Sequence, residues 1–144
     1  MADTAEAVLS APNILEYPYS RSVGPVISRF LTGLRERRIE GIRTTDGRVL
    51  VPPTEYDPET GDTLTEFVEV ATAGVVTTWA WVAAPRAKHL LDHPFAWALV
   101  RLDGADTVLL HRLLGTADIG GRVRAVLRPE RTASILDLQG FEPV

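Results

Sequence analysis

The segment Arg43–Gly61 has the residue spacing of a zinc ribbon. Such a ribbon binds Zn²⁺ through two knuckles, in each of which two residues separate the ligands and a glycine closes the turn. Structural zinc sites need about four Cys or His ligands, and this chain contains no cysteine. We therefore expect a metal-free hairpin whose role has moved from metal binding to contacts. The positions that correspond to the ligands are Arg43, Asp46, Asp57 and Thr60, and the closing residues are Gly47 and Gly61.

Two of the three histidines are spaced to share one helical face. His89 and His93 lie four residues apart with Asp92 beside them, and two ligands at that spacing can bind a metal. Because neither a third histidine nor a glutamate follows at a suitable position, we favour a polar loop with one short helical turn. His111 lies within the apolar run TVLLHRLLG, and we interpret it as a barrel-wall residue rather than a catalyst.

The motifs of the common enzyme classes are missing from the sequence. There is no G-x-S-x-G, no P-loop and no G-x-G-x-x-G after a strand, and without cysteine there is no thiol nucleophile. Asp57, Glu59 and Asp62 resemble a cation-binding run, but they lack the full spacing of an EF-hand, so we interpret them as turn residues. The sequence predicts neither a catalytic residue nor a metal site.

Arginines gather between residues 35 and 48, among Glu36, Glu40 and Asp46. The chain as a whole is mildly acidic, with a formal net charge of −4, and Lys88 is its single lysine. We favour a solvated helix end with salt bridges; the alternative is a patch that binds the phosphates of coenzyme A or an acidic partner surface. The candidate phosphate ligands are Arg35, Arg37, Arg38, Arg43 and Arg48.

A helix and a series of strands must position these residues. Residues 1–21 read as a flexible arm. Ser22–Arg38 is predicted to be a helix, because its first residue can cap it, Pro25 suits its first turn and apolar residues recur along one face. Ile39–Thr44 and Arg48–Val51 are predicted to form a hairpin around an Asp-Gly turn.

After residue 63 the pattern alternates between short strands and turns. Short strands with no long helix between them predict a small closed β-barrel or a sandwich. We expect residues 22–63 to form the helix and hairpin and residues 64–144 to form the barrel, with Val76, Leu99, Leu110 and Val126 in its core. The predicted strands are Phe67–Val70, Val75–Val82, Phe95–Leu102, Thr107–Leu114, Arg122–Leu127 and Ala133–Leu138.

The order of these features resembles one family, domain of unknown function thirty-five, across Val23–Val144. That family combines an N-terminal helix, a rubredoxin-like zinc ribbon and a C-terminal OB-fold. The most specific pieces are DGRVLVPP, the strand entry at Glu69–Val75 and IGGRVRAVL at Ile119–Leu127. The resemblance implies a mainly β chain, in which an OB-fold barrel follows a helix and a degenerate, metal-free zinc-ribbon hairpin.

The resemblance also implies a function. Family members accompany thiolase-like enzymes, and some actinobacterial members partner lipid-transfer-protein-like thiolase homologues that act as aldolases on steroid side-chain CoA thioesters. We therefore expect a non-catalytic accessory subunit of a hetero-oligomer, with acyl-CoA as the partner's substrate and no cofactor bound to this chain. The residues expected at the partner interface are Tyr17, Tyr19, Pro53, Tyr56, His89, Leu90, His93 and Phe95.

Two alternatives stay open. An OB-fold can bind single-stranded nucleic acid on aromatic side chains in a basic groove; Trp79, Trp81 and Trp97 are candidates, but the acidic net charge and single lysine argue against it. A stand-alone acyl-CoA-binding module would need the arginine cluster for the phosphates. No apolar run approaches ~18 residues and the start lacks the features of a secretory signal, so we expect a cytoplasmic protein without a membrane or nucleic-acid partner.

Overall fold

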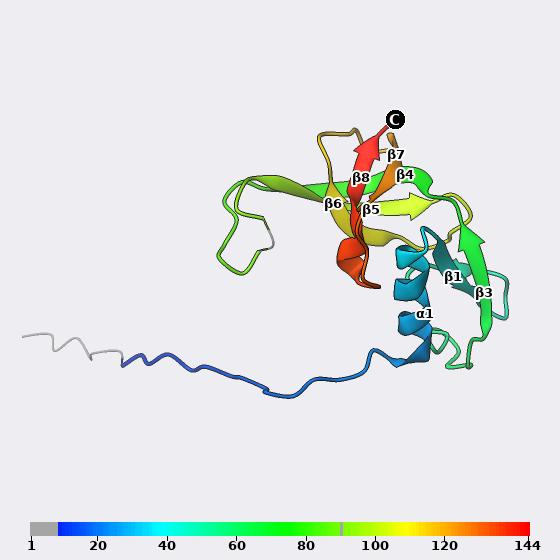
Figure 1. The fold of residues 1–144 in the computed structure, drawn as a ribbon, viewed down its shortest axis with the longest axis horizontal. Helices are drawn as coiled ribbons and strands as arrows, with labels where there is room; N and C mark the ends of the chain where they lie inside the picture. Colours follow the sequence, from blue (N-terminus) through cyan, green and yellow to red (C-terminus); the bar gives the residue numbers. More distant parts are fainter. Residues whose placement is uncertain (1–8, 90) are drawn as a thin grey trace, which may run out of the picture.

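The structure, a computed structural model, describes residues 9–89 and 91–144. Its strands form a small three-stranded sheet and a closed barrel. The segment before the α-helix runs away from the folded body as an extended arm (Figure 1). The elements are α1 (Gly24–Arg35), β1 (Ile39–Arg43), β2 (Val49–Leu50), β3 (Glu66–Val70), β4 (Ala73–Val82), β5 (Phe95–Leu102), β6 (Leu109–Leu113), β7 (Arg122–Leu127), the 3₁₀-helix η1 (Ile135–Asp137) and β8 (Leu138–Pro143).

Helix α1 confirms the predicted helix, although it begins two residues later and ends three residues earlier than expected. Its N-cap is Val23, with no side-chain cap, so the expected cap by Ser22 is wrong. At its start, the Ser22 hydroxyl accepts a hydrogen bond from the amide of Gly24 at 3.2 Å. At its end, Arg37 adopts a positive φ of 66°, and the amide of Arg38 donates to the carbonyl of Gly33 at 2.8 Å. This is the Schellman arrangement that ends helices. The last two arginines of the predicted helix therefore form its cap rather than its final turn.

The three-stranded sheet has β1 at its centre, antiparallel to β2 and β3. Helix α1 buries Val26, Phe30 and Leu34. Phe30 and Leu34 join the main core together with Ile39 of β1, while Val26 packs in a second cluster with Ile42 of the same strand. The alternation along β1 thus places its side chains in two separate apolar clusters.

The prediction that Phe67–Val70 belongs to the barrel is wrong. These residues are part of β3, every residue of which pairs with β1 in the small sheet. Only two residues separate β3 from β4, so the apolar pattern runs almost unbroken from one sheet into the next. The pattern predicts the strands correctly but contains no signal for the point at which the chain changes sheets.

The barrel has the strand order β4-β5-β6-β8-β7 and closes between β7 and β4. All neighbouring strands are antiparallel except β6 and β8, which are parallel. This five-stranded closed barrel has the OB-fold architecture, which confirms the expected fold class.

The last predicted strand, Ala133–Leu138, is wrong in position. Ser134 caps η1 by accepting a hydrogen bond from the amide of Leu136 at 3.2 Å, and its own amide donates to Asp137 at 3.2 Å. Asp137 also accepts from two preceding amides. This reciprocal capping box favours a helical turn, and the strand begins only at Leu138.

The predicted barrel core is partly correct. Val76 is fully buried, but Leu110 is 57% exposed, and the buried residues of β6 are Leu109, His111 and Leu113. Leu99 and Val126 are half-buried. Strand β6 carries leucines on both faces, and a register shift by one residue exchanges those faces, so the sequence does not fix which leucines point inward.

The loop between β5 and β6 joins the small sheet to the barrel. The amide of Val49 donates to the carboxylate of Asp106 at 2.8 Å, and the amide of Val51 donates to the hydroxyl of Thr107 at 2.7 Å. The main hydrophobic core combines side chains of α1 and the small sheet with those of the barrel. Within the described residues, no helix has the length and apolar character needed to cross a membrane.

Candidate functional site

One arginine side chain joins the two turns of the ribbon remnant, the segment Arg43–Gly61. Arg48 forms ion pairs with Asp46 at 2.9 Å and Glu59 at 2.8 Å, and its Nη2 lies 3.6 Å from Oδ1 of Asp57. Asp57 is buried, with 2% of its surface exposed. Asp46 and Asp57 occupy two of the predicted ligand positions, one in each turn. The guanidinium therefore links the turns that a zinc ion would link in a ribbon.

The charges of this network are mutually stabilised. Hydrogen bonds from the Thr44 hydroxyl and then from the Arg48 guanidinium hold the pKa of Asp46 below its usual value, and Asp46 raises the pKa of Arg48. Both shifts favour the charged forms. Among the described residues, no group of three or more His, Asp or Glu side chains is placed to hold a metal ion. Metal-free folding of this segment stays a prediction.

The other two predicted ligand positions make local contacts. Arg43 forms an ion pair with Glu66 of β3 at 2.9 Å, and the Thr60 hydroxyl donates to Asp62 at 2.9 Å. Both contacts lie at the surface. They hold the turns to their neighbours without connecting one turn to the other.

Three of the five arginines that were candidates for binding phosphate form ion pairs with carboxylates of the same chain. Arg38 pairs with Glu36 at 2.5 Å, and the two ribbon arginines pair as described above. Arg35 and Arg37 are exposed at the end of α1. One of these ion pairs, that of Arg38, lies at the end of α1, and the others lie in the hairpin. Binding of coenzyme A phosphates by these five residues stays a prediction.

The arm before α1 exposes two of the residues expected at a partner interface. Tyr17 and Tyr19 are 71% and 66% exposed, and their rings meet edge to face with centroids 6.1 Å apart. Tyr56, on the ribbon remnant, is also exposed. These side chains are available to another protein.

The other expected contact residues are placed differently. Pro53 and Phe95 are buried: the first packs within the fold, and the second starts a barrel strand. Their place at a partner interface stays a prediction. His93 is exposed, with Nδ1 3.1 Å from the carboxylate of Asp92. Leu90 lies outside the described residues.

His89 and His93 do not share a helical face. The segment that contains them has no helix among its described residues, and the amide of His89 donates to the carbonyl of Arg86 in a turn at 2.9 Å. The ring of His89 accepts a hydrogen bond from the Arg86 amide at 2.9 Å and packs edge to face on Phe95, with centroids 5.9 Å apart. This agrees with the interpretation as a loop.

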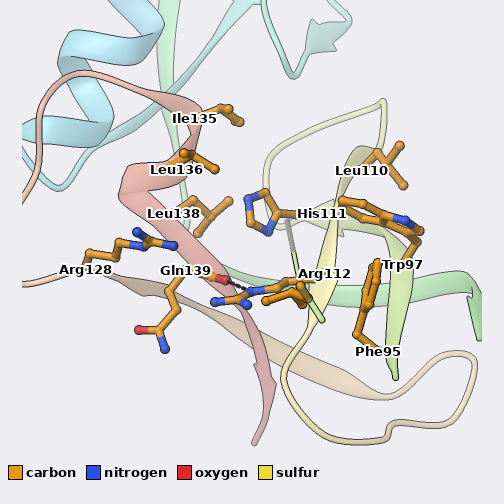
Figure 2. Close-up of a pocket in the computed structure, with 11 residues that line it drawn as sticks. Phe95, Trp97, Leu110, His111, Arg112, Arg128, Ile135, Leu136, Leu138 and Gln139 are labelled. Carbon is orange, nitrogen blue, oxygen red and sulfur yellow. Dashed lines mark hydrogen bonds between the residues drawn. The ribbon is translucent and has the colours of Figure 1, made fainter. Parts of the chain in front are cut away.

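A cleft of about 320 Å³ lies on the barrel wall formed by β5 and β6. Phe95, Trp97 and Leu110 line one side, and Leu136 and Leu138, from η1 and β8, line the other, with the ring of His111 between them (Figure 2). The volume is within the range of small-molecule sites. Sequence elements far apart in the chain therefore form one apolar surface with a histidine in it.

His111 is buried in this cleft, with 8% of its surface exposed. Its Nδ1 has no hydrogen-bond partner among the described residues. Burial lowers the pKa of His111 from 6.5 to about 4, so the ring is neutral at pH 7. The prediction that it is a barrel-wall residue is correct for its position, although the wall on which it lies is hollowed.

Arg112 and Arg128 lie where the cleft meets a more polar groove, since both line the cleft and the groove. Nε of Arg112 donates to the carbonyl of Gln139 (Figure 2). Within the described part of the chain, neither guanidinium takes part in an ion pair. Burial and the neighbouring Arg128 lower the pKa of Arg112. Two like charges therefore lie near each other without an ion-pair partner, although Glu130 also lines the groove.

Sequence reasoning missed this cleft. Its charged residues, Arg112 and Arg128, lie outside the arginine cluster that drew attention in the sequence, and its apolar wall depends on the register of β6. One signal was present: a His-Arg pair interrupts the apolar run TVLLHRLLG. Polar residues within a barrel strand need a partner or a solvent-facing cavity, so this pair could have indicated a site.

The fold and these sites define an OB-fold protein with an appended, ribbon-like sheet. Residues 67–128 match the family model of the C-terminal OB-fold domain of ChsH2. This match covers strands β4 to β7 and confirms the resemblance noted in the sequence. Among curated proteins, none matches the chain significantly.

Two solved structures share the fold. A protein of unknown function from the DUF35 family of Sulfolobus solfataricus is 24% identical, with a TM-score of 0.60, over 72% of this chain and 78% of its own. A chain of the Ltp2-ChsH2(DUF35) aldolase is 23% identical, with a TM-score of 0.63, over 86% of this chain and 98% of its own. Both matches cover more of the chain than the barrel alone, so the shared fold includes residues outside the barrel.

Proposed function

We propose that this chain is a non-catalytic partner subunit of a heteromeric enzyme of the aldolase or thiolase type. The observation that carries the proposal is the match of residues 67–128 to the OB-fold domain of ChsH2, together with the similarity to nearly the whole length of a chain in the Ltp2-ChsH2(DUF35) aldolase. In this proposal the partner is a thiolase-like, lipid-transfer-protein-like enzyme that acts on acyl-CoA, for example by retro-aldol cleavage of a steroid side chain.

The arm supplies a physical means of binding a partner. Residues 9–23 are all exposed, and no helix or strand forms among them. Segments of this kind order on binding and can wrap around another protein. The large exposed side chains of the arm are Leu9, Ile14, Leu15, Tyr17 and Tyr19.

The chemistry in this proposal belongs to the partner. The cleft contains a neutral histidine and two arginines, but no carboxylate, serine or second histidine lines it to complete a nucleophile or an acid–base pair. A nucleophile needs a base within hydrogen-bonding reach, and that base needs an orienting group. The groups in the cleft are suited to binding rather than to bond cleavage.

Co-expression tests the proposal directly. The full chain and a thiolase-like enzyme encoded beside it should elute together, with a mass by light scattering that equals a heteromer. A variant with serine at Ile14, Leu15, Tyr17 and Tyr19 keeps the arm's length and should weaken the complex. Ile119→Ser is the matched control, because Ile119 is 68% exposed but lies in the loop between β6 and β7.

The proposal fails if the enzyme is soluble and equally active alone and no complex forms at micromolar concentration. A complex that tolerates the serine arm but is lost with Ile119→Ser would place the interface on the barrel. That result would retain the subunit role and reject the arm as its main contact.

A further inference from the structure

We propose that the cleft on β5 and β6 binds a small amphipathic anion, with its apolar body between Trp97 and Leu138 and its head group between Arg112 and Arg128. The head group is a carboxylate or a phosphate monoester, which both suit the planar fork of a guanidinium. This site goes beyond the partner-subunit role and needs no partner for its test.

The apolar walls account for the body of the ligand. The cleft of about 320 Å³ is bounded by aromatic rings on β5 and by leucines from η1 and β8. Leu110 and Leu136 remain 57% and 38% exposed, although they face the same cleft. Covering such side chains with an apolar ligand is favourable in proportion to the area removed from water.

His111 provides a second, independent indication of a ligand. A buried polar atom without a hydrogen bond is unfavourable, and such atoms in native proteins call for a specific explanation. Nδ1 of His111 is such an atom, and its ring lies within the cleft (Figure 2). A head-group oxygen that accepts a hydrogen bond from this nitrogen, in the neutral tautomer that carries its proton there, would satisfy it.

The two arginines account for the negative head group. Elsewhere in the described residues, many arginines have a carboxylate partner: Arg29, Arg38, Arg43, Arg48, Arg122 and Arg124. Arg112 and Arg128 have none, and their mutual repulsion would be relieved by an anion. Two carboxylates, Glu130 and Asp137, line the adjoining groove. Asp137 already accepts hydrogen bonds from three backbone amides, and Glu130 forms no ion pair with an arginine among the described residues. The cleft therefore lacks a compensating acid of its own.

The position of the cleft agrees with this assignment. In OB-folds, the face of the second and third strands and the loop between the last two strands bind ligands; here these are β5, β6 and the segment from β7 to β8. A polynucleotide would need a basic groove along its backbone, whereas this chain has a net charge of −4 and a short, mainly apolar cleft. The features favour a single small molecule.

Calorimetry on the full chain tests the proposal with decanoate and decyl phosphate as probes. At least one of them should bind, and neutral decanol and inorganic phosphate should each bind more weakly. Arg128→Gln should lower the affinity for the anionic probe about tenfold, as expected for the loss of one charged hydrogen bond, and should leave the affinity for decanol unchanged. Leu110→Ser should lower the affinity for the anionic probe and for decanol. Arg101→Gln is the matched control, because Arg101 is exposed on β5 and lines neither cleft nor groove.

Chemical-shift mapping locates the bound probe. The indole of Trp97 and the ring of His111 should respond, whereas Trp79 and Trp81 should not. Absence of binding by both anions, equal binding of decanol, or responses confined to Trp79 and Trp81 would each overturn the proposal. Tight binding of a single-stranded oligonucleotide that decanoate does not displace would also overturn it and favour a polymer site.

Discussion

The guanidinium of Arg48 lies 3.6 Å from the buried carboxylate of Asp57, and this contact spans the two turns of the ribbon remnant. The same guanidinium pairs with Asp46 in the first turn and Glu59 in the second. An organic cation therefore makes the connection for which a zinc ribbon uses a metal. A charge network can hold two turns together in this way only while each buried charge has its partner.

Replacing Arg48 with glutamine should destabilise the protein by roughly 1–3 kcal/mol, because the buried Asp57 would lose its cation. Urea unfolding followed by circular dichroism measures the change. Arg43→Gln is the matched control: its pair with Glu66 is exposed, so its loss should change the unfolding free energy by about 0–1 kcal/mol. Equal losses of unfolding free energy for the two substitutions would show that the contact of Arg48 with Asp57 does not stabilise the fold.

The ribbon remnant should fold without a bound metal ion. Since Arg48 links the turns and the predicted ligand positions provide no thiolate or imidazole, purified protein should contain zinc well below one atom per chain by elemental analysis. Treatment with a chelator should not change the melting temperature. A zinc atom that is released only on unfolding would contradict this prediction, because structural zinc sites contribute directly to folding.

The register of β6 can be tested with neighbouring leucines. Leu109→Ala and Leu113→Ala should each destabilise the protein by about 2–4 kcal/mol, because both side chains are buried in the core. Leu110→Ala should change the unfolding free energy by about 0.5 kcal/mol or less, since Leu110 is exposed. Thermal or urea unfolding of the three variants measures this. A large loss in Leu110→Ala alone would show the opposite register.

The sequence predicted most elements because local signals specify them. Pro25 and an apolar face marked α1, and the Asp-Gly turn after Thr45 marked the hairpin of β1 and β2. The strands of the barrel were predictable from β-branched residues between turns. The position of the final strand was predicted wrongly, although a local signal was present: Ser134 and Asp137 have the spacing of a capping box, which marks the start of a helical turn.

The candidate site was harder to predict for a different reason. The cleft combines Trp97, His111 and Leu138 from three strands, and no spacing in a single segment relates them. The predicted phosphate ligands near α1 were chosen because they are close in sequence, whereas Arg112 and Arg128 are brought together only by the barrel. A site formed across strands becomes visible once strand order and register are known.

His111 should make stability depend on pH. Its pKa is about 4 in the folded protein and about 6.5 in an unfolded chain, so between these values the unfolded state binds the proton and the folded state does not. The free energy of unfolding is therefore highest above pH 6.5, where the ring is neutral in both states, and it decreases as the pH falls toward 4.

Between pH 7 and pH 4, wild type should therefore lose roughly 2–3 kcal/mol more than His111→Phe, which has no group to protonate at this position. Urea unfolding at several pH values measures both slopes, and the comparison cancels the contribution of the carboxylates. Parallel slopes for wild type and His111→Phe would mean that the ring at position 111 is protonated as easily in the folded protein as in the unfolded chain, and that its burial carries no electrostatic penalty.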